Sequence, residues 1–156
     1  MCGLVGFVSK GLHKYEGVDI LNKIKKTINH RGPNDDGIWF DKNINLYLGH
    51  QRLSILDLSI SGSQPMHSSS KRYVIVYNGE IYNHLKLRKD IEEKTSNNIN
   101  WNSTSDTETL LNYIEVFGLE ICLNAIRGMF AFALWDKKDK KLILCRDSIG
   151  EKPLYF

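Results

Sequence analysis

The chain has 156 residues, enough for one globular domain with a substantial core. Hydrophobic residues make up 42% of it and charged residues 25%, as in ordinary globular proteins. The net charge is only +3, and the lysines are scattered apart from a short charged turn at residues 137–141. No basic stripe with interleaved aromatics is present, so the sequence predicts no nucleic-acid partner.

The apolar run at residues 4–8 is too short for the core of a signal peptide. No apolar stretch is long enough for a transmembrane span, so no membrane partner is expected. Three cysteines without framework spacing favour the reducing cytoplasm over a disulfide scaffold. Neither a C-x-x-C motif nor a His-x-x-x-His pair occurs, so no metal site is predicted.

In the first half of the chain, apolar spacing predicts three strands and one helix. The strands are expected at residues 4–8, 38–40 and 46–50, and the helix over roughly residues 17–29. Turn-forming residues predict a polar loop at residues 30–37. Residues 51–70 are expected to be long and irregular, a length typical of functional or mobile segments.

The second half begins with a predicted strand at residues 72–77 that runs into Asn78-Gly79-Glu80. One helix is expected to begin after Asn83 and to end at about Lys94. A second helix is expected to begin with a cap at Ser105 or Asp106 and to end at Phe117. The Asn- and Ser-rich residues 95–105 predict a surface loop, and residues 129–135 and 142–145 predict a hairpin. Strands and helices in this order favour a layered α/β or α+β domain with antiparallel sheet.

Cys2 directly follows the initiator methionine. Removal of Met1 would leave a thiol and a free α-amine on one residue, and the amine, with an ordinary pKa of about 7.7–8.0, can accept the thiol proton. A nucleophile activated by an N-terminal amine is a known route to acyl transfer. A cysteine can also stand second by chance, unless the chain builds a site around the amino terminus. Cys122 and Cys145 fall in helix and strand patterns typical of core thiols.

Attack on a carboxamide also requires donors for the oxyanion that forms. Asn78 offers a side-chain NH₂, and Gly79 allows close approach to a bare backbone N–H. Asn-Gly between apolar runs is equally a hairpin-turn pattern.

A free amino acid needs partners for both of its charged ends. Arg31 or Arg52 could bind an α-carboxylate, and Asp106 or Glu80 could bind an α-ammonium. The ordinary alternatives are a helix cap for Asp106 and a surface ion pair for Arg52. No histidine is required as a base, and His50 is expected to lie nearest the pocket.

With these residues in place, the chain resembles the N-terminal glutaminase domains of glutamine-hydrolysing asparagine synthetases. Those domains are class II glutamine amidotransferases and N-terminal-nucleophile hydrolases. Eight matching segments follow the family order: residues 1–6 (MCGLVG), 30–33 (HRGP), 50–55 (HQRLSI), 64–66 (QPM), 77–83 (YNGEIYN), 105–108 (SDTE), 128–133 (GMFAFA) and 146–155 (RDSIGEKPLY).

The resemblance implies a role for each matched position. Cys2 would form a γ-glutamyl thioester with its own amine as base, and Asn78 and Gly79 would form the oxyanion hole. The remaining positions would bind glutamine. They are Arg52 for the α-carboxylate, Asp106 and Glu80 for the α-ammonium, the backbone around Leu53 and Ile55 as lining, and Arg31-Gly32 as the wall beside the nucleophile.

The resemblance further implies a four-layer αββα sandwich with two antiparallel sheets, formed by one domain over residues 1–156 that is shortened at its C-terminal end. The family's synthetase domain, with its Ser-Gly-Gly-x-Asp-Ser loop, is not matched by residues 61–64. ATP and magnesium are therefore expected only in that absent domain, and no cofactor is expected here. The expected partners are L-glutamine, the synthetase domain and a second copy in a full-length homodimer.

Three functions stay open at this stage. The first is a glutaminase that supplies ammonia for ATP-dependent asparagine synthesis from aspartate. The second is a glutaminase whose ammonia aminates a sugar or another acid in surface-polysaccharide synthesis. The third is a catalytically silent fragment that binds glutamine or regulates a partner.

Overall fold

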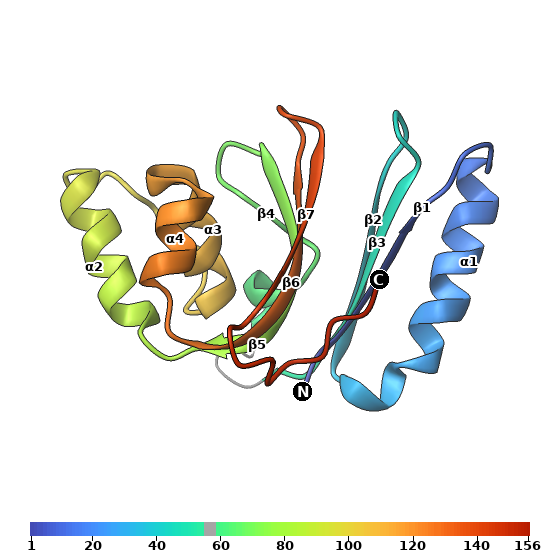
Figure 1. Ribbon diagram of the computed structural model, residues 1–156, viewed down its shortest axis with the longest axis horizontal. Helices are drawn as coiled ribbons and strands as arrows, with labels where there is room; N and C mark the ends of the chain where they lie inside the picture. The colour runs from blue at the N-terminus through green and yellow to red at the C-terminus, as the bar shows by residue number, and fades with distance from the viewer. Residues whose placement is uncertain (55–58) are drawn as a thin grey trace.

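The computed structural model describes residues 1–54 and 59–156, which form four layers. Figure 1 shows a helical layer, two facing sheets and a second helical layer in succession. The first two layers contain β1 (Gly3–Val8), α1 (Lys14–Thr27), β2 (Asp35–Asp41) and β3 (Leu46–Arg52). The other two contain β4 (Met66–His67), β5 (Tyr73–Ile81), α2 (His84–Lys94), α3 (Asp106–Phe117), α4 (Leu119–Ala125), β6 (Gly128–Asp136) and β7 (Lys141–Arg146). Short 3₁₀ turns span Asn29–Arg31 and Ile60–Gly62.

The first sheet has the order β1-β3-β2, with both neighbours antiparallel to β3. Every residue of β3 is buried, because α1 covers one face of this strand and the second sheet covers the other. Gly17 lets α1 pass directly over the sheet, since a Cβ there would lie 2.1 Å from the Tyr47 ring.

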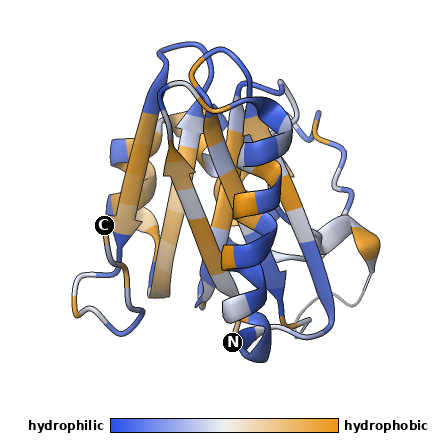
Figure 2. Ribbon diagram, turned by 90° about the vertical axis from the view of Figure 1, so that its right-hand side faces the viewer, coloured by the Kyte–Doolittle hydropathy of each residue, from blue (hydrophilic) through white to orange (hydrophobic). Residues whose placement is uncertain are grey.

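The second sheet has the order β4-β5-β6-β7, and all of its pairs are antiparallel. One face packs against α2, α3 and α4. The other presents Val74 and Val76 to Leu46 and Leu48 of β3, which gives the apolar contact between the sheets. The strands in Figure 2 are accordingly orange over much of their length, with blue concentrated at turns and loops.

The four-layer αββα sandwich predicted from the resemblance is confirmed. The helix expected over residues 17–29 begins earlier, at Lys14, where the His13 N–H donates to the Glu16 carboxylate at 3.2 Å. Among the described residues, no helix is long and apolar enough to cross a bilayer.

Two loop predictions were wrong in part. Residues 35–37 open β2 and are not loop, because their backbone pairs with residues 50–52 of β3. Residues 51–70 are less irregular than expected, since Gln51 and Arg52 extend β3 and Met66–His67 pairs with β5. In both segments the backbone pairs across a sheet, and the polarity of the side chains does not reveal such pairing in the sequence.

Candidate active site

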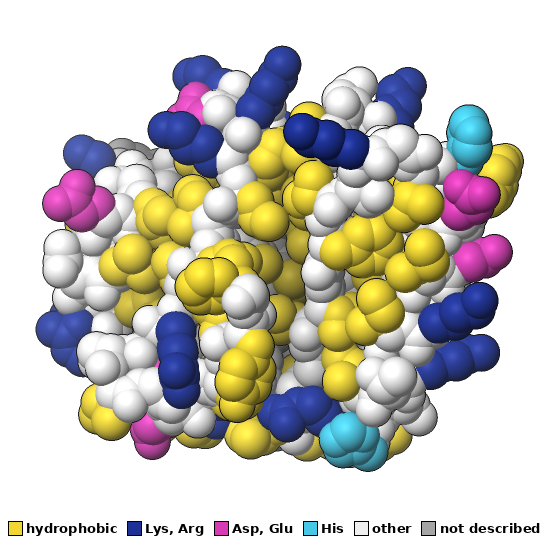
Figure 3. Space-filling model, turned by 45° about the vertical axis from the view of Figure 1, so that its right-hand side comes forward, with side chains coloured by type: hydrophobic (Ala, Val, Ile, Leu, Met, Phe, Trp, Pro, Cys, Tyr) yellow, Lys and Arg dark blue, Asp and Glu magenta, His cyan; other side chains and the backbone are white. Residues whose placement is uncertain are grey.

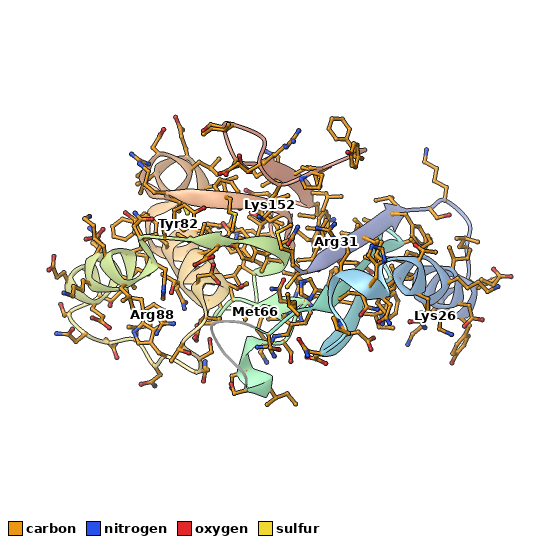
Figure 4. All side chains as sticks on the ribbon, turned by 90° about the horizontal axis from the view of Figure 1, so that it is seen from below. Lys26, Arg31, Met66, Tyr82, Arg88 and Lys152 are labelled. Carbon is orange, nitrogen blue, oxygen red and sulfur yellow. The ribbon has the colours of Figure 1, made fainter. Side chains whose placement is uncertain are left out.

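A pocket of about 90 Å³ lies at the end of the sandwich that holds the amino terminus. Figure 4 views the molecule from this end, with the labelled Arg31 and Lys152 near the middle, away from Lys26 and Arg88 at the two outer helical layers. Seven of the ten predicted site residues line the pocket: Cys2, Arg52, Leu53, Asn78, Gly79, Glu80 and Asp106. Residues from both sheets and from α3 therefore meet around the amino terminus.

The thiol of Cys2 is held against the backbone of Leu53. The Leu53 N–H donates to Sγ at 3.3 Å, and Sγ lies 3.6 Å from the Leu53 carbonyl. Arg31 donates from Nε to the Cys2 carbonyl at 3.1 Å, which fixes the backbone on the other side of the thiol. Met1 also lines the pocket, so its removal would both free the amine and enlarge the space beside Sγ.

Asn78 and Gly79 lie inside β5 and do not form the hairpin turn that their sequence also allows. The close approach of β6 leaves no room for a side chain at position 79, because a Cβ on Gly79 would lie 2.3 Å from the Met129 carbonyl oxygen. Phe130 faces Gly79 across the sheet, but its N–H and C=O bind Asp147 at 3.2 and 2.8 Å. The Gly79 N–H therefore points to the opposite edge of β5, toward the pocket.

That edge of β5 is open beyond the short strand β4. The Tyr77 N–H donates to Gln64 Oε1 at 2.7 Å, and the Ile81 N–H donates to Asp106 Oδ2 at 2.9 Å. Gly79 lies between these two residues on the same edge. Side chains thus bind the two flanking N–H groups, and the one between them faces the cavity.

Asp106 is at the first position of α3, and the cap is Ser105, whose side chain accepts from the Glu108 N–H. Asp106 is 6% exposed, and its Oδ2 accepts from the Tyr77 hydroxyl at 2.8 Å as well as from Ile81. Burial and the Asp106 carboxylate raise the pKa of Tyr77 well above its usual value. Tyr77 therefore remains a donor and fixes the carboxylate at the pocket wall.

Arg52 is 7% exposed, which differs from the surface ion pair considered as its alternative. Its Nη1 donates to the Ser59 carbonyl at 2.8 Å and lies 3.8 Å from Asp35 Oδ2. Two other predicted positions lie beside the pocket. Arg31 and Gly32 are not among the lining residues but pack beside Cys2 and β3, where a Cβ on Gly32 would meet the backbone oxygen of Gln51 at 2.4 Å. Ile55 lies outside the described residues.

Sequence reasoning missed several residues that line the pocket, and Lys152 is the most notable. It is 4% exposed, and its ammonium donates to the thioether of Met129, a weak acceptor. Its backbone N–H binds Asp147 at 3.0 Å, which brings the 147–152 loop under β6. Lys152 was quoted only as part of a matching segment, and nothing in its local sequence indicates that it is buried.

A second cavity of about 560 Å³ opens between the two sheets next to the first. Apolar side chains of β1, β3 and β7 line it, and Asn78 borders both cavities. Figure 3 shows yellow side chains gathered along the middle of this face of the molecule. Among residues 1–54 and 59–156 there is no group of three or more His, Cys, Asp or Glu side chains placed to hold a metal ion.

The whole chain, residues 1–156, matches the protein family described as the glutamine amidotransferase domain. The chain belongs to this family. It is 38% identical to asparagine synthetase [glutamine-hydrolyzing] 1 of Bacillus subtilis and 39% identical to putative asparagine synthetase [glutamine-hydrolyzing] 2 of Methanocaldococcus jannaschii. These matches cover 100% of the chain but only 24% and 32% of the relatives, so the chain spans about a quarter to a third of their length.

A solved structure supports the fold of this amidotransferase domain. Glutamine phosphoribosylpyrophosphate amidotransferase from B. subtilis, complexed with ADP and GMP, superposes with a TM-score of 0.66. The superposition covers 96% of the chain and 37% of that structure, at 19% sequence identity. The sandwich is therefore shared well beyond recognisable sequence similarity.

His50 lies behind the pocket and is completely buried. Burial lowers its pKa from 6.5 to about 4 and Arg52 contributes in the same direction, while the bond to the Tyr77 carbonyl and nearby Asp35 act against the shift. The folded protein therefore keeps this imidazole neutral at pH 7.

We expect this buried imidazole to make the domain less stable in mild acid. Between its unfolded pKa of 6.5 and its folded pKa of about 4, the unfolded chain binds a proton that the folded chain does not, so the free energy of unfolding decreases as pH falls. From pH 7 to 4.5 the loss attributable to His50 is roughly 2–3 kcal/mol. Urea unfolding at both pH values should show a smaller loss in a folded His50→Gln variant. An equal loss in both proteins would contradict this assignment.

Proposed function

We propose that this domain hydrolyses glutamine to glutamate and ammonia through a γ-glutamyl thioester on Cys2. The observation that supports this most strongly is the meeting of the amino-terminal thiol with Arg52, Asn78, Gly79 and Asp106 in one pocket. A chance cysteine at position 2 would not require buried charged groups of both signs around it. Membership of the amidotransferase family supports the same reaction.

In the first half-reaction, Cys2 Sγ attacks the side-chain carboxamide carbon of glutamine after passing its proton to the α-amine freed by loss of Met1. The Leu53 N–H at 3.3 Å suits a sulfur that carries negative charge. The oxyanion accepts hydrogen bonds from Asn78 Nδ2 and the Gly79 N–H, and one such donor is worth about 2.7–4 kcal/mol.

The tetrahedral adduct then collapses to the thioester, and the amine gives the proton to the leaving nitrogen, so ammonia departs and the first half-reaction is complete. In the second half-reaction, a water molecule gives its proton to the same amine and attacks the thioester carbon. Glutamate leaves, and the thiol of Cys2 regains its proton. The oxyanion donors act in both halves because both pass through a tetrahedral intermediate.

The charged ends of glutamine match the charges of the pocket. Arg52 would bind the α-carboxylate through parallel hydrogen bonds. Asp106 and Glu80 would bind the α-ammonium, and Oδ2 of Asp106 is already occupied by Tyr77 and Ile81, which leaves Oδ1 for the substrate. Leu53 and the Arg31-Gly32 segment would supply lining and support beside the thiol.

We further propose that the ammonia serves ATP-dependent synthesis of asparagine from aspartate, in a synthetase domain joined to this one. Support comes from two relatives at 38% and 39% identity, both named as glutamine-hydrolysing asparagine synthetases and both three to four times as long. Release of ammonia by the domain tests the first proposal, and amination of aspartate by the longer protein tests the second.

The Cys2→Ser variant should lose ammonia release by roughly 1,000-fold or more, because a hydroxyl is a far weaker nucleophile beside an amine base. Ammonia from glutamine is measured with a coupled glutamate dehydrogenase assay. Cys145→Ser is the matched control, since Cys145 lies on β7 and should leave the rate unchanged. Activity retained by pure Cys2→Ser protein would remove Cys2 from its proposed role.

The Asp106→Asn variant should bind glutamine more weakly, because it removes the negative charge but keeps an oxygen for Ile81 and Tyr77. A hydrogen bond to a charged group contributes about 1.5–3 kcal/mol, so KM should rise about 10- to 100-fold while kcat changes little. Asp90→Asn, on the solvent side of α2 beside Lys86, serves as the charge-matched control. An unchanged KM would mean that Asp106 does not bind glutamine and only stabilises β5.

A further inference from the structure

The two outward-facing backbone groups of Tyr77 are bound by side chains from outside their own sheet. β4 pairs with β5 only as far as Ile75, so no strand within residues 1–54 and 59–156 lies beside the next outward-facing groups of β5. The Tyr77 N–H donates to Gln64 at 2.7 Å, and the Tyr77 carbonyl lies 3.0 Å from Nε2 of His50. The Tyr77 carbonyl, which belongs to the peptide unit that enters Asn78, is thus bound by a residue of the opposite sheet.

His50 reaches Tyr77 because of its place on β3. Leu46 and Leu48 belong to the apolar contact between the sheets, and side chains two residues apart on a strand share a face. His50 is the next residue on that face, so it points across the gap to β5. It provides a polar link at the end of an otherwise apolar contact and is completely buried there.

The chemistry of this contact specifies the state of the imidazole. A carbonyl can only accept, so Nε2 must carry the hydrogen. Among the described residues, Nδ1 is buried and has no hydrogen-bond partner. A proton on Nδ1 would therefore lack an acceptor, which agrees with the depressed pKa of about 4 and with the positive charge of Arg52 nearby. Only the neutral imidazole with hydrogen on Nε2 fits.

We propose that His50 is a positioning residue for the oxyanion site, which its Nε2–H aligns by binding the carbonyl of the peptide that enters Asn78. The proposal rests on the proposed glutaminase function. The same strand, β3, pairs Gln51 with Gly3 directly after Cys2, and it leads into Leu53, which holds Sγ. His50 therefore connects the strand that places the nucleophile to the strand that presents the oxyanion donors.

Misplacement of catalytic groups by about 1 Å can cost about 100-fold in rate. We therefore expect His50→Leu, which fills the space but cannot donate, to lower kcat for ammonia release about 10- to 100-fold. KM should stay within about threefold, because Arg52 and Asp106 are untouched and ground-state binding does not use the oxyanion donors. His50→Gln, whose amide N–H can reach the same carbonyl, should recover most of the rate.

His84→Leu is the matched control, because the Nδ1 of His84 is also buried with no hydrogen-bond partner in the described part of the chain, but this residue lies at the start of α2. It should show wild-type kcat. Wild-type kcat in folded His50→Leu protein would overturn the proposal. So would an equal loss of kcat in His50→Gln and His50→Leu, which would indicate that any change there damages packing. A wild-type protein that releases no ammonia would instead contradict the glutaminase function.

A measurement on the unmodified protein covers the case in which His50→Leu does not fold. Nitrogen NMR of protein with ¹⁵N-labelled histidine distinguishes the two neutral tautomers from the protonated ring. His50 should show hydrogen on Nε2 alone from pH 8 to pH 5. Hydrogen on Nδ1, or protonation near pH 6.5, would overturn the proposal whatever the activity of the variants.

Discussion

The apolar contact between the two sheets sets the geometry on which the site depends. The nucleophile precedes β1 in one sheet, and the proposed oxyanion donors lie on β5 in the other, so their relative position depends on how the two sheets pack. Leu46 and Leu48 packed against Val74 and Val76 fix that separation along most of the contact. At the end near the pocket a hydrogen bond replaces apolar packing, because carbonyl and amide groups of β5 must be satisfied there.

The pocket combines two buried cations with two carboxylates, which suits a zwitterionic amino acid. Arg52 and Lys152 are both nearly inaccessible to solvent, as is Asp106, and Glu80 is half-buried. Charges of this kind are costly to bury unless they are paired or hydrogen-bonded. The hydrogen bond from Arg52 to the Ser59 carbonyl and the bond from Tyr77 to Asp106 hold two of these charges in place before a substrate arrives. Such preorganisation reduces the ordering that binding would otherwise require.

Apolar periodicity predicted most of the helices and strands, because it records which face of each element is buried. The four-layer arrangement was predicted from the family resemblance. The sequence predicted seven of the pocket residues through motifs that surround them. It left Asn78-Gly79 undecided between strand and turn, since only pairing with β6 distinguishes the two. The buried ammonium of Lys152 and the link from His50 to Tyr77 depend on contacts between distant segments, which no local pattern encodes.

The central claim is that a processed amino-terminal thiol reacts with glutamine in this pocket. The most direct test is the intact mass of the purified protein before and after exposure to the glutamine analogue 6-diazo-5-oxo-norleucine, followed by peptide mapping. The account predicts loss of Met1 and one stoichiometric adduct, located on Cys2. A protein that keeps Met1, a processed protein that takes no label, or an adduct on Cys122 or Cys145 would contradict it.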